Sequence, residues 1–373
     1  MPQRTLDEIR AVLLDKARRK LNPVVFVPPE ILTEAMAPLT STDRDAWAHA
    51  FLEAAIPYER QADAARAEAR PEDELAALKI AYGLCWLGRY PAANSAGKRA
   101  AYARARANHR HLLHRLDPEA QRVEIPFSGR ESEGRVIPAF LRRPPGSGTH
   151  ALPTILTWGG IDTFKEERSV LVEPFLKAGF AVLAIDMPGT GESPVNGASD
   201  ALRVWGAVFD WLDARDDVDH ARVAVHGLST GGYWATQVAH VYKNRIAAAI
   251  NQGGCAHYAF DQSWIATMDQ GEYALELPET LASAWGLSTR EEWIAYAPSL
   301  SLLRSGVVDT PCAPMLLVNG VDDSIFPIDD MYLLLRQGQA KTARFYPGGH
   351  MGPGAQTIPL MIGWLKATLG IAG

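Results

Sequence analysis

The sequence predicts an α/β protein: a mostly parallel sheet flanked by helices, preceded by a separate helical domain. The first 120 residues contain only three of the 31 glycines and are rich in Ala, Arg, Glu and Leu, which lose little side-chain freedom in a helix. From Gln121 onward, short apolar runs without alternation are interleaved with segments of helical period. This is the pattern of a parallel sheet buried on both faces.

The N-terminal residues 1–120 are expected to form a helical cap domain. Thr5 and Glu8 form a capping-box pattern, and Leu6, Ile9, Val12 and Leu13 follow at helical spacing. Further helices are predicted at about 43–69, 73–88 and 95–115, with proline-containing breaks at 22–23, 28–29 and 90–91.

Residues 121–373 are expected to form the catalytic domain. Val123–Phe127 and Val136–Leu141 predict a strand pair joined by a polar turn. Further strands are predicted at 154–157, 181–185, 223–225, 246–250 and 315–318 and at the run ARFYP, with helices at 201–214 and 233–242.

About sixty residues separate the predicted strand ending at Ile250 from the one that starts at Met315, far more than a crossover needs. We interpret residues of about 255–305 as a helical, lid-like insertion. Its aromatic residues are Tyr258, Phe260, Trp264, Tyr273, Trp285, Trp293 and Tyr296. They either pack onto the main domain or form a substrate wall, for which Trp264, Trp285 and His257 are the candidate substrate-binding residues.

The run Gly227-Leu228-Ser229-Thr230-Gly231 has the G-x-S-x-G pattern, directly after the strand-like RVAVH and before a helical segment. In that context the pattern predicts a strained strand-to-helix turn that lifts a serine above the sheet edge. Ser229 is therefore the predicted nucleophile, placed where helix N–H groups stabilise negative charge.

A serine nucleophile needs a base and a group that orients this base. The run NGVDDSIFP follows a predicted strand, and in G-x-x-D-x-x-x-P spacing the acid is Asp323, with Asp322 as the alternative. His350, in the glycine-rich loop GGHMG, is the predicted base. The chain order is then Ser, Asp, His.

Two N–H groups are expected to bind the oxyanion. One belongs to Thr230, which follows the nucleophile, and the other to Ile161 or, alternatively, Gly160, at the glycine pair after a strand. Residues 162–167 are predicted to start a helix. Residues 186–193 have the glycines of a phosphate loop without its lysine, so we interpret them as a structural turn.

Composition excludes several other classes of protein. A net charge of −6 does not favour binding to nucleic acid or to an anionic membrane. No apolar run approaches the length that spans a bilayer. Three cysteines without CxxC spacing favour a reducing cytoplasm. We expect no metal and no cofactor: His109, His111 and His114 are interpreted as a solvated helix face, and His226 as a core residue.

With these residues in place, the chain from about Val123 resembles the α/β-hydrolase superfamily. The WGGID run with Lys165 and Glu166, the DMPGTGES turn, the GLSTGG elbow, NGVDDSIFP and GGH are similar to the branch of FrsA-like esterases, dihydroxypseudooxynicotine hydrolase and naphthopyrone chain-shortening hydrolases. The resemblance implies a Ser-His-Asp hydrolase, often a homodimer, that acts on esters or on C–C bonds beside a ketone.

The sequence therefore favours a serine hydrolase that cleaves a C–C bond next to a ketone in a bulky aryl or polyketide-like small molecule. The alternatives are a carboxylic ester or thioester hydrolase, a cyclase or acyl transferase of the same fold, and a binding module without catalysis.

Overall fold

The computed structural model describes residues 4–352 and 354–372, which fall into two compact units. A helical unit runs to Ala120 and also includes Ala274–Thr280. A sheet unit takes Gln121–Tyr273 and the chain from Leu281 onward. Among the described residues, no helix is both long and apolar enough to cross a membrane.

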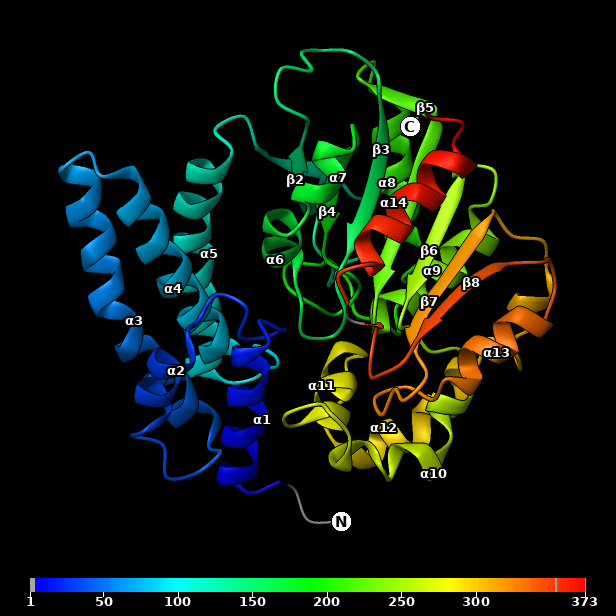
Figure 1. Ribbon diagram of the computed structural model, residues 1–373. Helices are drawn as coiled ribbons and strands as arrows, with labels where there is room; N and C mark the ends of the chain where they lie inside the picture. Colours follow the sequence, from blue (N-terminus) through cyan, green and yellow to red (C-terminus); the bar gives the residue numbers. More distant parts are fainter. Residues whose placement is uncertain (1–3, 353, 373) are drawn as a thin grey trace. The chain divides into compact units, whose positions relative to one another are not determined.

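The helical unit is built from the helices at the start of the chain (Figure 1): α1 (Leu6–Arg18), α2 (Pro29–Met36), α3 (Arg44–Ala67), α4 (Pro71–Arg89) and α5 (Ala96–Leu116). The Thr5 hydroxyl accepts the N–H of Glu8, and the Glu8 carboxylate accepts the N–H of Thr5, so α1 begins with a capping box. Helices α3, α4 and α5 pack against one another. Between α3 and α4, the Trp47 indole N–H donates to the carbonyl of Leu87 at 2.8 Å.

Residues 274–280 join the helical unit through charged side chains, although the sequence indicated only that they belong to the insertion. Glu276 pairs with Arg44 at 2.9 Å and with the Lys98 ammonium at 3.6 Å. Burial lowers the pKa of Lys98 to about 8. No local pattern around Glu276 indicates these partners, since Arg44 lies 232 residues earlier in the chain.

The sheet unit contains one eight-stranded sheet with the order β1-β2-β4-β3-β5-β6-β7-β8. The strands are β1 (Gln121–Pro126), β2 (Val136–Arg142), β3 (Leu152–Trp158), β4 (Ala181–Ile185), β5 (Val218–Leu228), β6 (Ala248–Gln252), β7 (Met315–Gly320) and β8 (Thr342–Tyr346). Strand β2 pairs antiparallel with β1 and β4. The other six strands, β3 to β8, pair parallel with one another in the sheet, so their carboxyl ends meet at one edge.

The predicted strands are present, but their boundaries differ, most of all at β5 and β6. Strand β6 starts at Ala248, two residues after the predicted start, and extends to Asn251 and Gln252. Those polar residues can stay in the strand because the amide of Asn251 donates to Thr236 and the amide oxygen of Gln252 contacts His226. Strand β5 extends well beyond the three apolar residues that predicted it.

The sheet is flanked by the helices α6 (Lys165–Val170), α7 (Glu173–Lys177), α8 (Arg203–Asp213), α9 (Thr230–Val241), α13 (Asp329–Arg336) and α14 (Thr357–Thr368). Helix α6 begins at Lys165, three residues after the predicted start at Asp162. Two buried carboxylates fix this later start: Glu167 accepts the N–H of Phe164, and Asp186 accepts that of Lys165.

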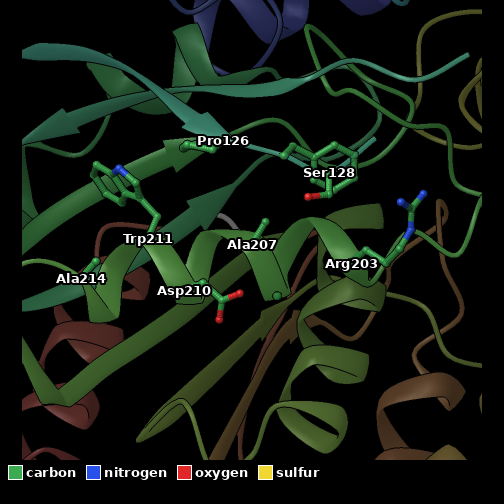
Figure 2. Close-up of a pocket in the computed structure, with 9 residues that line it drawn as sticks. Pro126, Ser128, Arg203, Ala207, Asp210, Trp211 and Ala214 are labelled. Carbon is green, nitrogen blue, oxygen red and sulfur yellow. The ribbon is translucent and has the colours of Figure 1, made fainter. Parts of the chain in front are cut away.

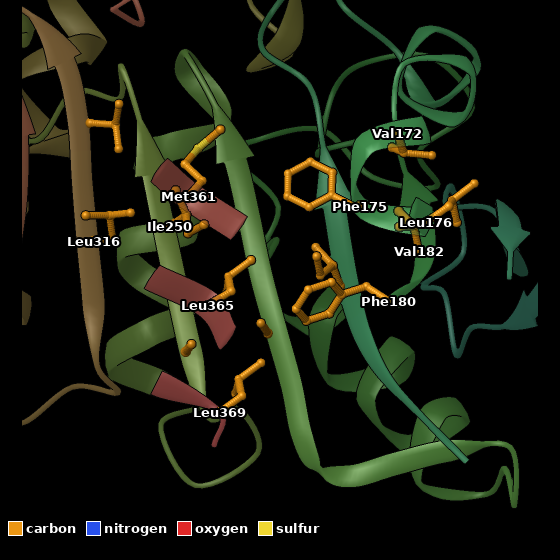
Figure 3. Close-up of a cluster of buried hydrophobic side chains, with 14 residues drawn as sticks. Val172, Phe175, Leu176, Phe180, Val182, Ile250, Leu316, Met361, Leu365 and Leu369 are labelled. Carbon is orange, nitrogen blue, oxygen red and sulfur yellow. The ribbon is translucent and has the colours of Figure 1, made fainter. Parts of the chain in front are cut away.

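One part of the core lies where α7 and α14 pack on the central strands (Figure 3). Met361, Leu365 and Leu369, spaced four apart at α14, share one helix face. On the strands, Ala248 and Ile250, like Leu316 and Val318, are two residues apart and therefore share one face of the sheet. This packing holds the central strands rigidly under the loops at their carboxyl ends.

The insertion consists of short helices: η1 (Tyr258–Phe260), α10 (Gln262–Ile265), η2 (Met268–Gln270), α11 (Leu277–Ala284), α12 (Arg290–Tyr296), η3 (Ala297–Leu300) and η4 (Val307–Asp309). Trp285 fastens it to the sheet unit, because its ring stacks on Trp234 of α9 and packs against Trp293 of α12. Trp234 in turn contacts Trp205 of α8, whose ring packs against Trp158 of β3.

Trp285 is only 1% exposed. A ring enclosed by Trp234, Trp293 and the backbone at Gly197 has no face left for a ligand. We therefore assign Trp285 to the core, in place of the substrate-binding role that the sequence predicted for it.

Candidate active site

Ser229 sits in the turn between β5 and α9, with backbone angles φ 53° and ψ −128°. Positive φ is costly for a residue with a side chain and is typical of a nucleophile elbow. The strained turn is held by the N–H of Ser229, which donates to the carbonyl of Gln252 at 2.7 Å. Gly231 is required beside it, because a Cβ there would lie 2.7 Å from the Trp158 ring.

The structure brings Ser229, His350 and Asp323 into one hydrogen-bonded series. Ser229 Oγ lies 2.7 Å from His350 Nε2, and His350 Nδ1 lies 2.8 Å from Asp323 Oδ2. These residues follow β5, β8 and β7, whose carboxyl ends share one edge of the sheet. The imidazole is also flanked by the Phe326 ring, edge-on at 5.7 Å.

The two adjacent carboxylates have different partners. Asp323 is buried and accepts the N–H groups of Ile325 and Phe326 at 2.8 and 3.0 Å, in addition to the imidazole. Asp322 is exposed, and its carboxylate accepts the N–H of Gly348 at 3.1 Å. Asp323 therefore contacts the ring of His350, whereas the carboxylate of Asp322 contacts the backbone of the loop that carries His350.

The side chains of Glu272 and Asn319 also hold this loop, and sequence reasoning missed both. Glu272 accepts the N–H of His350 at 2.9 Å, and Asn319 accepts that of Met351 at 2.8 Å. Asn319 lies directly before the glycine of the acid motif, so an amide at a buried strand end was the available signal. Glu272 lies more than fifty residues from Asp323 in the insertion, and no spacing rule connects the two.

The predicted oxyanion donors lie next to the nucleophile. A Cβ added to Gly160 would be 2.7 Å from the Cβ of Ser229 and 3.2 Å from its Oγ, so this loop passes directly over the serine. Ile161 and Thr230 are both buried. Within the described residues, neither backbone N–H donates to a protein acceptor. Both remain available for an oxygen that becomes negative.

Trp264 and His257 occupy different surroundings in the insertion. The half-buried Trp264 donates from its indole to the carbonyl of Ile325 at 3.0 Å, two residues from Asp323. The ring of His257 contacts the Ser301 hydroxyl at 2.7 Å and the Tyr258 ring, neither of which belongs to the hydrogen-bonded series. Trp264 is therefore the better placed candidate for substrate contact.

The other histidines that the sequence singled out depart from the predictions at one position. His111 and His114 are exposed, as expected, but His109 is fully buried and packs against the Tyr82 ring, so it does not belong to a solvated face. His226 is buried, and burial lowers its pKa to about 3, which keeps the ring neutral. Over the described residues, no group of three or more His, Cys, Asp or Glu could hold a metal ion.

The turn at residues 186–193 is held by a buried ion cluster. Asp186 accepts the N–H of Glu192 at 2.8 Å and pairs with the Lys165 ammonium at 2.9 Å. That ammonium also contacts the carboxylates of Glu166 and Glu192 at 2.8 Å each. The cluster ties the turn after β4 to the start of α6.

A surface groove of about 560 Å³ lies along α8, next to the end of β1 (Figure 2). Its lining residues are Pro126, Phe127, Ser128, Arg203, Gly206, Ala207, Asp210, Trp211 and Ala214. None of them belongs to the hydrogen-bonded series at the strand ends. Arg203 is paired with Glu133 at 2.6 Å, and Asp210 with Arg245 at 3.0 Å.

Comparison with known proteins finds curated relatives that are similar to part of this chain. The chain is 27% identical over 215 residues to 2,6-dihydropseudooxynicotine hydrolase from Paenarthrobacter nicotinovorans, covering 56% of this chain and 53% of the relative. It is 25% identical over 242 residues to Esterase FrsA from Photobacterium profundum, covering 64% and 57%. The matched part thus spans about half the length of these curated relatives.

The fold is also that of a solved hydrolase. The crystal structure of the 2,6-dihydroxy-pseudo-oxynicotine hydrolase superposes with a TM-score of 0.73 at 23% identity, covering 91% of this chain and 92% of that one. The model of the family described as Esterase FrsA-like matches residues 46–344, which is most of the chain. This protein therefore has the α/β-hydrolase fold and belongs to the FrsA-like esterase family.

Proposed function

We propose that this protein is a serine hydrolase in which Ser229 is the nucleophile, His350 the general base and Asp323 the group that orients the imidazole. The observation that carries the proposal is the pair of hydrogen bonds of 2.7 and 2.8 Å that joins the three side chains. A serine hydroxyl needs such a base to become nucleophilic near neutral pH. The triad requires neither a metal nor a cofactor.

In this proposal, Ser229 Oγ bonds to a carbonyl carbon while His350 Nε2 takes the hydroxyl proton. The N–H groups of Ile161 and Thr230 donate to the carbonyl oxygen as it becomes negative. The imidazolium then gives its proton to the leaving group, and an acyl-enzyme remains on Ser229. A water molecule, deprotonated by His350, attacks this ester, releases the acid and restores the serine.

For the substrate, we propose a bulky aryl or polyketide-like small molecule whose C–C bond beside a ketone is cleaved. The leaving group is then a stabilised carbanion, and it is the carbon that receives the proton from His350. Support comes from the sequence resemblance and from the relative named 2,6-dihydropseudooxynicotine hydrolase. The half-buried Trp264, tethered beside the acid loop, is the residue proposed to contact such a substrate.

Hydrolysis of a carboxylic ester or thioester is the second candidate. It is favoured by the esterase name of the family and uses the same triad, with an alkoxide or thiolate as leaving group. We further propose that the protein acts in the cytoplasm as a homodimer. The three free, buried cysteines suit a reducing compartment, and the homodimer is implied by the resemblance alone.

Covalent labelling tests the nucleophile. A fluorophosphonate should label Ser229 in the wild-type protein, and Ser229→Ala should abolish both labelling and hydrolysis. Ser128→Ala, which removes an exposed serine of the groove along α8, is the control and should change neither. Labelling that persists at another serine in the Ser229→Ala protein would overturn the assignment.

A product assay tests the leaving group. Purified enzyme is offered aryl ketones, β-diketones, esters and thioesters, and the products are identified by mass spectrometry. Turnover of ketones with release of an acid supports C–C cleavage, whereas turnover restricted to esters or thioesters supports the second candidate. Cyclised or transferred products would contradict hydrolysis, and failure to acylate would indicate a binding module.

A further inference from the structure

The side-chain amide of Asn319 connects the proposed acid to the loop of the proposed base. Asn319 lies near the end of β7 and is 1% exposed. Its Nδ2 donates to Asp323 Oδ2 at 2.9 Å, and its Oδ1 accepts the N–H of Met351 at 2.8 Å. The amide orientation follows from these partners, because a carboxylate only accepts and a backbone N–H only donates.

The Asn319 amide donates to the same oxygen of Asp323 that contacts the imidazole of His350. Asp323 Oδ2 receives both the Asn319 amide and the Nδ1–H of His350, while Oδ1 is held by two backbone N–H groups. The carboxylate therefore has a donor on each side and cannot rotate without losing one. This fixes the direction from which the imidazole is held.

At the base, the same amide holds a strained residue. Met351 follows His350 directly and has φ 64°, a conformation that costs energy in a residue with a side chain. The hydrogen bond from its N–H to Asn319 offsets part of this cost. One planar amide thus sets the position of the acid and of the base loop relative to each other.

We propose that Asn319 is a positioning residue of this active site, one that keeps the carboxylate of Asp323 and the imidazole of His350 in register. This inference rests on the proposed function, because it assumes that the two residues act on Ser229. Neither asparagine oxygen nor nitrogen touches the reacting atoms. A substitution of Asn319 should therefore change the turnover number and the pH dependence of the reaction, which depend on the position and the proton of the imidazole.

A matched control is available on the neighbouring strand. Asn251 lies in β6, is also fully buried, and donates its amide to Thr236 Oγ1 at 2.9 Å while accepting the N–H of Gly254 at 2.7 Å. Asn251→Ala therefore removes the same chemistry at an equal depth without touching Asp323 or His350. The comparison separates a general loss of packing from a specific loss of positioning.

The first measurement is the kinetics of a nitrophenyl ester with the full-length protein. Asn319→Ala should lower kcat by about 10- to 100-fold with little change in KM, since misplaced catalytic groups lose turnover rather than binding. Asn251→Ala should lower kcat much less for a similar fall in melting temperature. Equal losses of kcat in the two variants would overturn the proposal.

The second measurement is the pH profile of the nearly isosteric Asn319→Asp. Two carboxyl groups in contact share one proton, so the new side chain stays protonated and donates to Asp323 at lower pH; when that proton leaves, kcat/KM should fall along a new limb that the wild-type profile lacks. The other titratable groups around the pair are Glu272 and Asp322, which accept N–H groups of the His350 loop, and Cys255 and Asp330 near the acid. They are unchanged in the variant, and a pH profile identical to that of the wild type would contradict the proposal even if Asn319→Ala fails to fold.

A third measurement distinguishes this inference from the proposed function itself. Ser229→Ala and Asp323→Asn are assayed beside the Asn319 variants. If both retain hydrolysis, the triad assignment is wrong. If both are inactive while the Asn319 variants behave like Asn251→Ala, the triad stands and only the positioning role fails.

Discussion

Polar side chains between the helices of one unit and those near the strand ends of the other have different kinds of partner. In the helical unit, half-buried and buried side chains pair with one another, as Glu59 does with Arg104 and Asn108. In the sheet unit, carboxylates and amides at the strand ends hold loop backbone instead. Asp330, at the start of α13, likewise accepts the N–H groups of the four residues 256–259. The candidate site therefore lies where side chains bond to loop backbone that no helix or strand pairs.

Two adjacent carboxylates show both kinds of contact. Asp322 accepts the backbone N–H of Gly348, whereas Asp323 contacts the imidazole of His350. Asp323→Asn should lower turnover by about 10³- to 10⁴-fold, because the imidazole loses the partner that fixes its tautomer. Asp322→Asn keeps an acceptor for Gly348 and should cost only a few-fold. Steady-state kinetics of both variants is the measurement, and the reverse ranking would make Asp322 the triad acid.

A second test asks whether the aromatic insertion serves stability or substrate. Trp285→Ala should lower the free energy of unfolding by about 3–5 kcal/mol, since it leaves a cavity between Trp234 and Trp293. Trp264→Ala should instead raise KM for aryl ketones and leave nitrophenyl acetate hydrolysis within a few-fold. Urea unfolding and kinetics separate the two, and a large stability loss in Trp264→Ala would remove its proposed substrate role.

A third test adds one methyl group where backbone passes over the nucleophile. In Gly160→Ala the new Cβ would lie 2.7 Å from that of Ser229, and this displacement should lower kcat/KM by about 100-fold. Gly363→Ala is the control, because a Cβ there meets no atom within 4 Å and alanine favours helix α14. Activity retained in Gly160→Ala would show that the loop can withdraw from the serine.

The smallest effect is expected in the helical unit, at Lys98. Burial lowers the pKa of Lys98 from 10.5 to about 8. Between these values the unfolded chain binds a proton that the folded protein does not, so this group makes stability rise with pH from about 8 to 10.5. Urea unfolding of wild type and Lys98→Met at pH 7.5 and 10 should differ by about 1–2 kcal/mol in this pH dependence. Identical pH dependences would show that Lys98 does not titrate in this range.

Much of the fold and of the site could be predicted from local pattern. The capping box at Thr5, the unbroken apolar runs of the parallel strands, and the elbow around Ser229 each depend on neighbours within a few residues. Each of these patterns has a local physical cause: helix capping for the first, burial on two faces for the second and a tight turn for the third.

Contacts between distant segments could not be predicted in this way. The insertion was expected to offer aromatic faces, but only the fold shows that Trp285 is enclosed by Trp234 and Trp293. Likewise, His109 is buried by packing against Tyr82, whereas the local sequence of arginines and histidines suggested a solvated face. Glu272 and Asn319 gain their roles only when the carboxyl ends of the strands converge.

The assignment of residues 274–280 to the helical unit has a consequence for synthesis on the ribosome. The helices up to Ala120 are translated first, yet Glu276, the partner of Arg44 and Lys98, follows about 160 residues later. At roughly 5–20 residues per second, this is a delay of about 8–30 s. During that interval the nascent helices lack the carboxylate of Glu276, so the helical unit is completed only after the sheet-unit residues 121–273 have been translated.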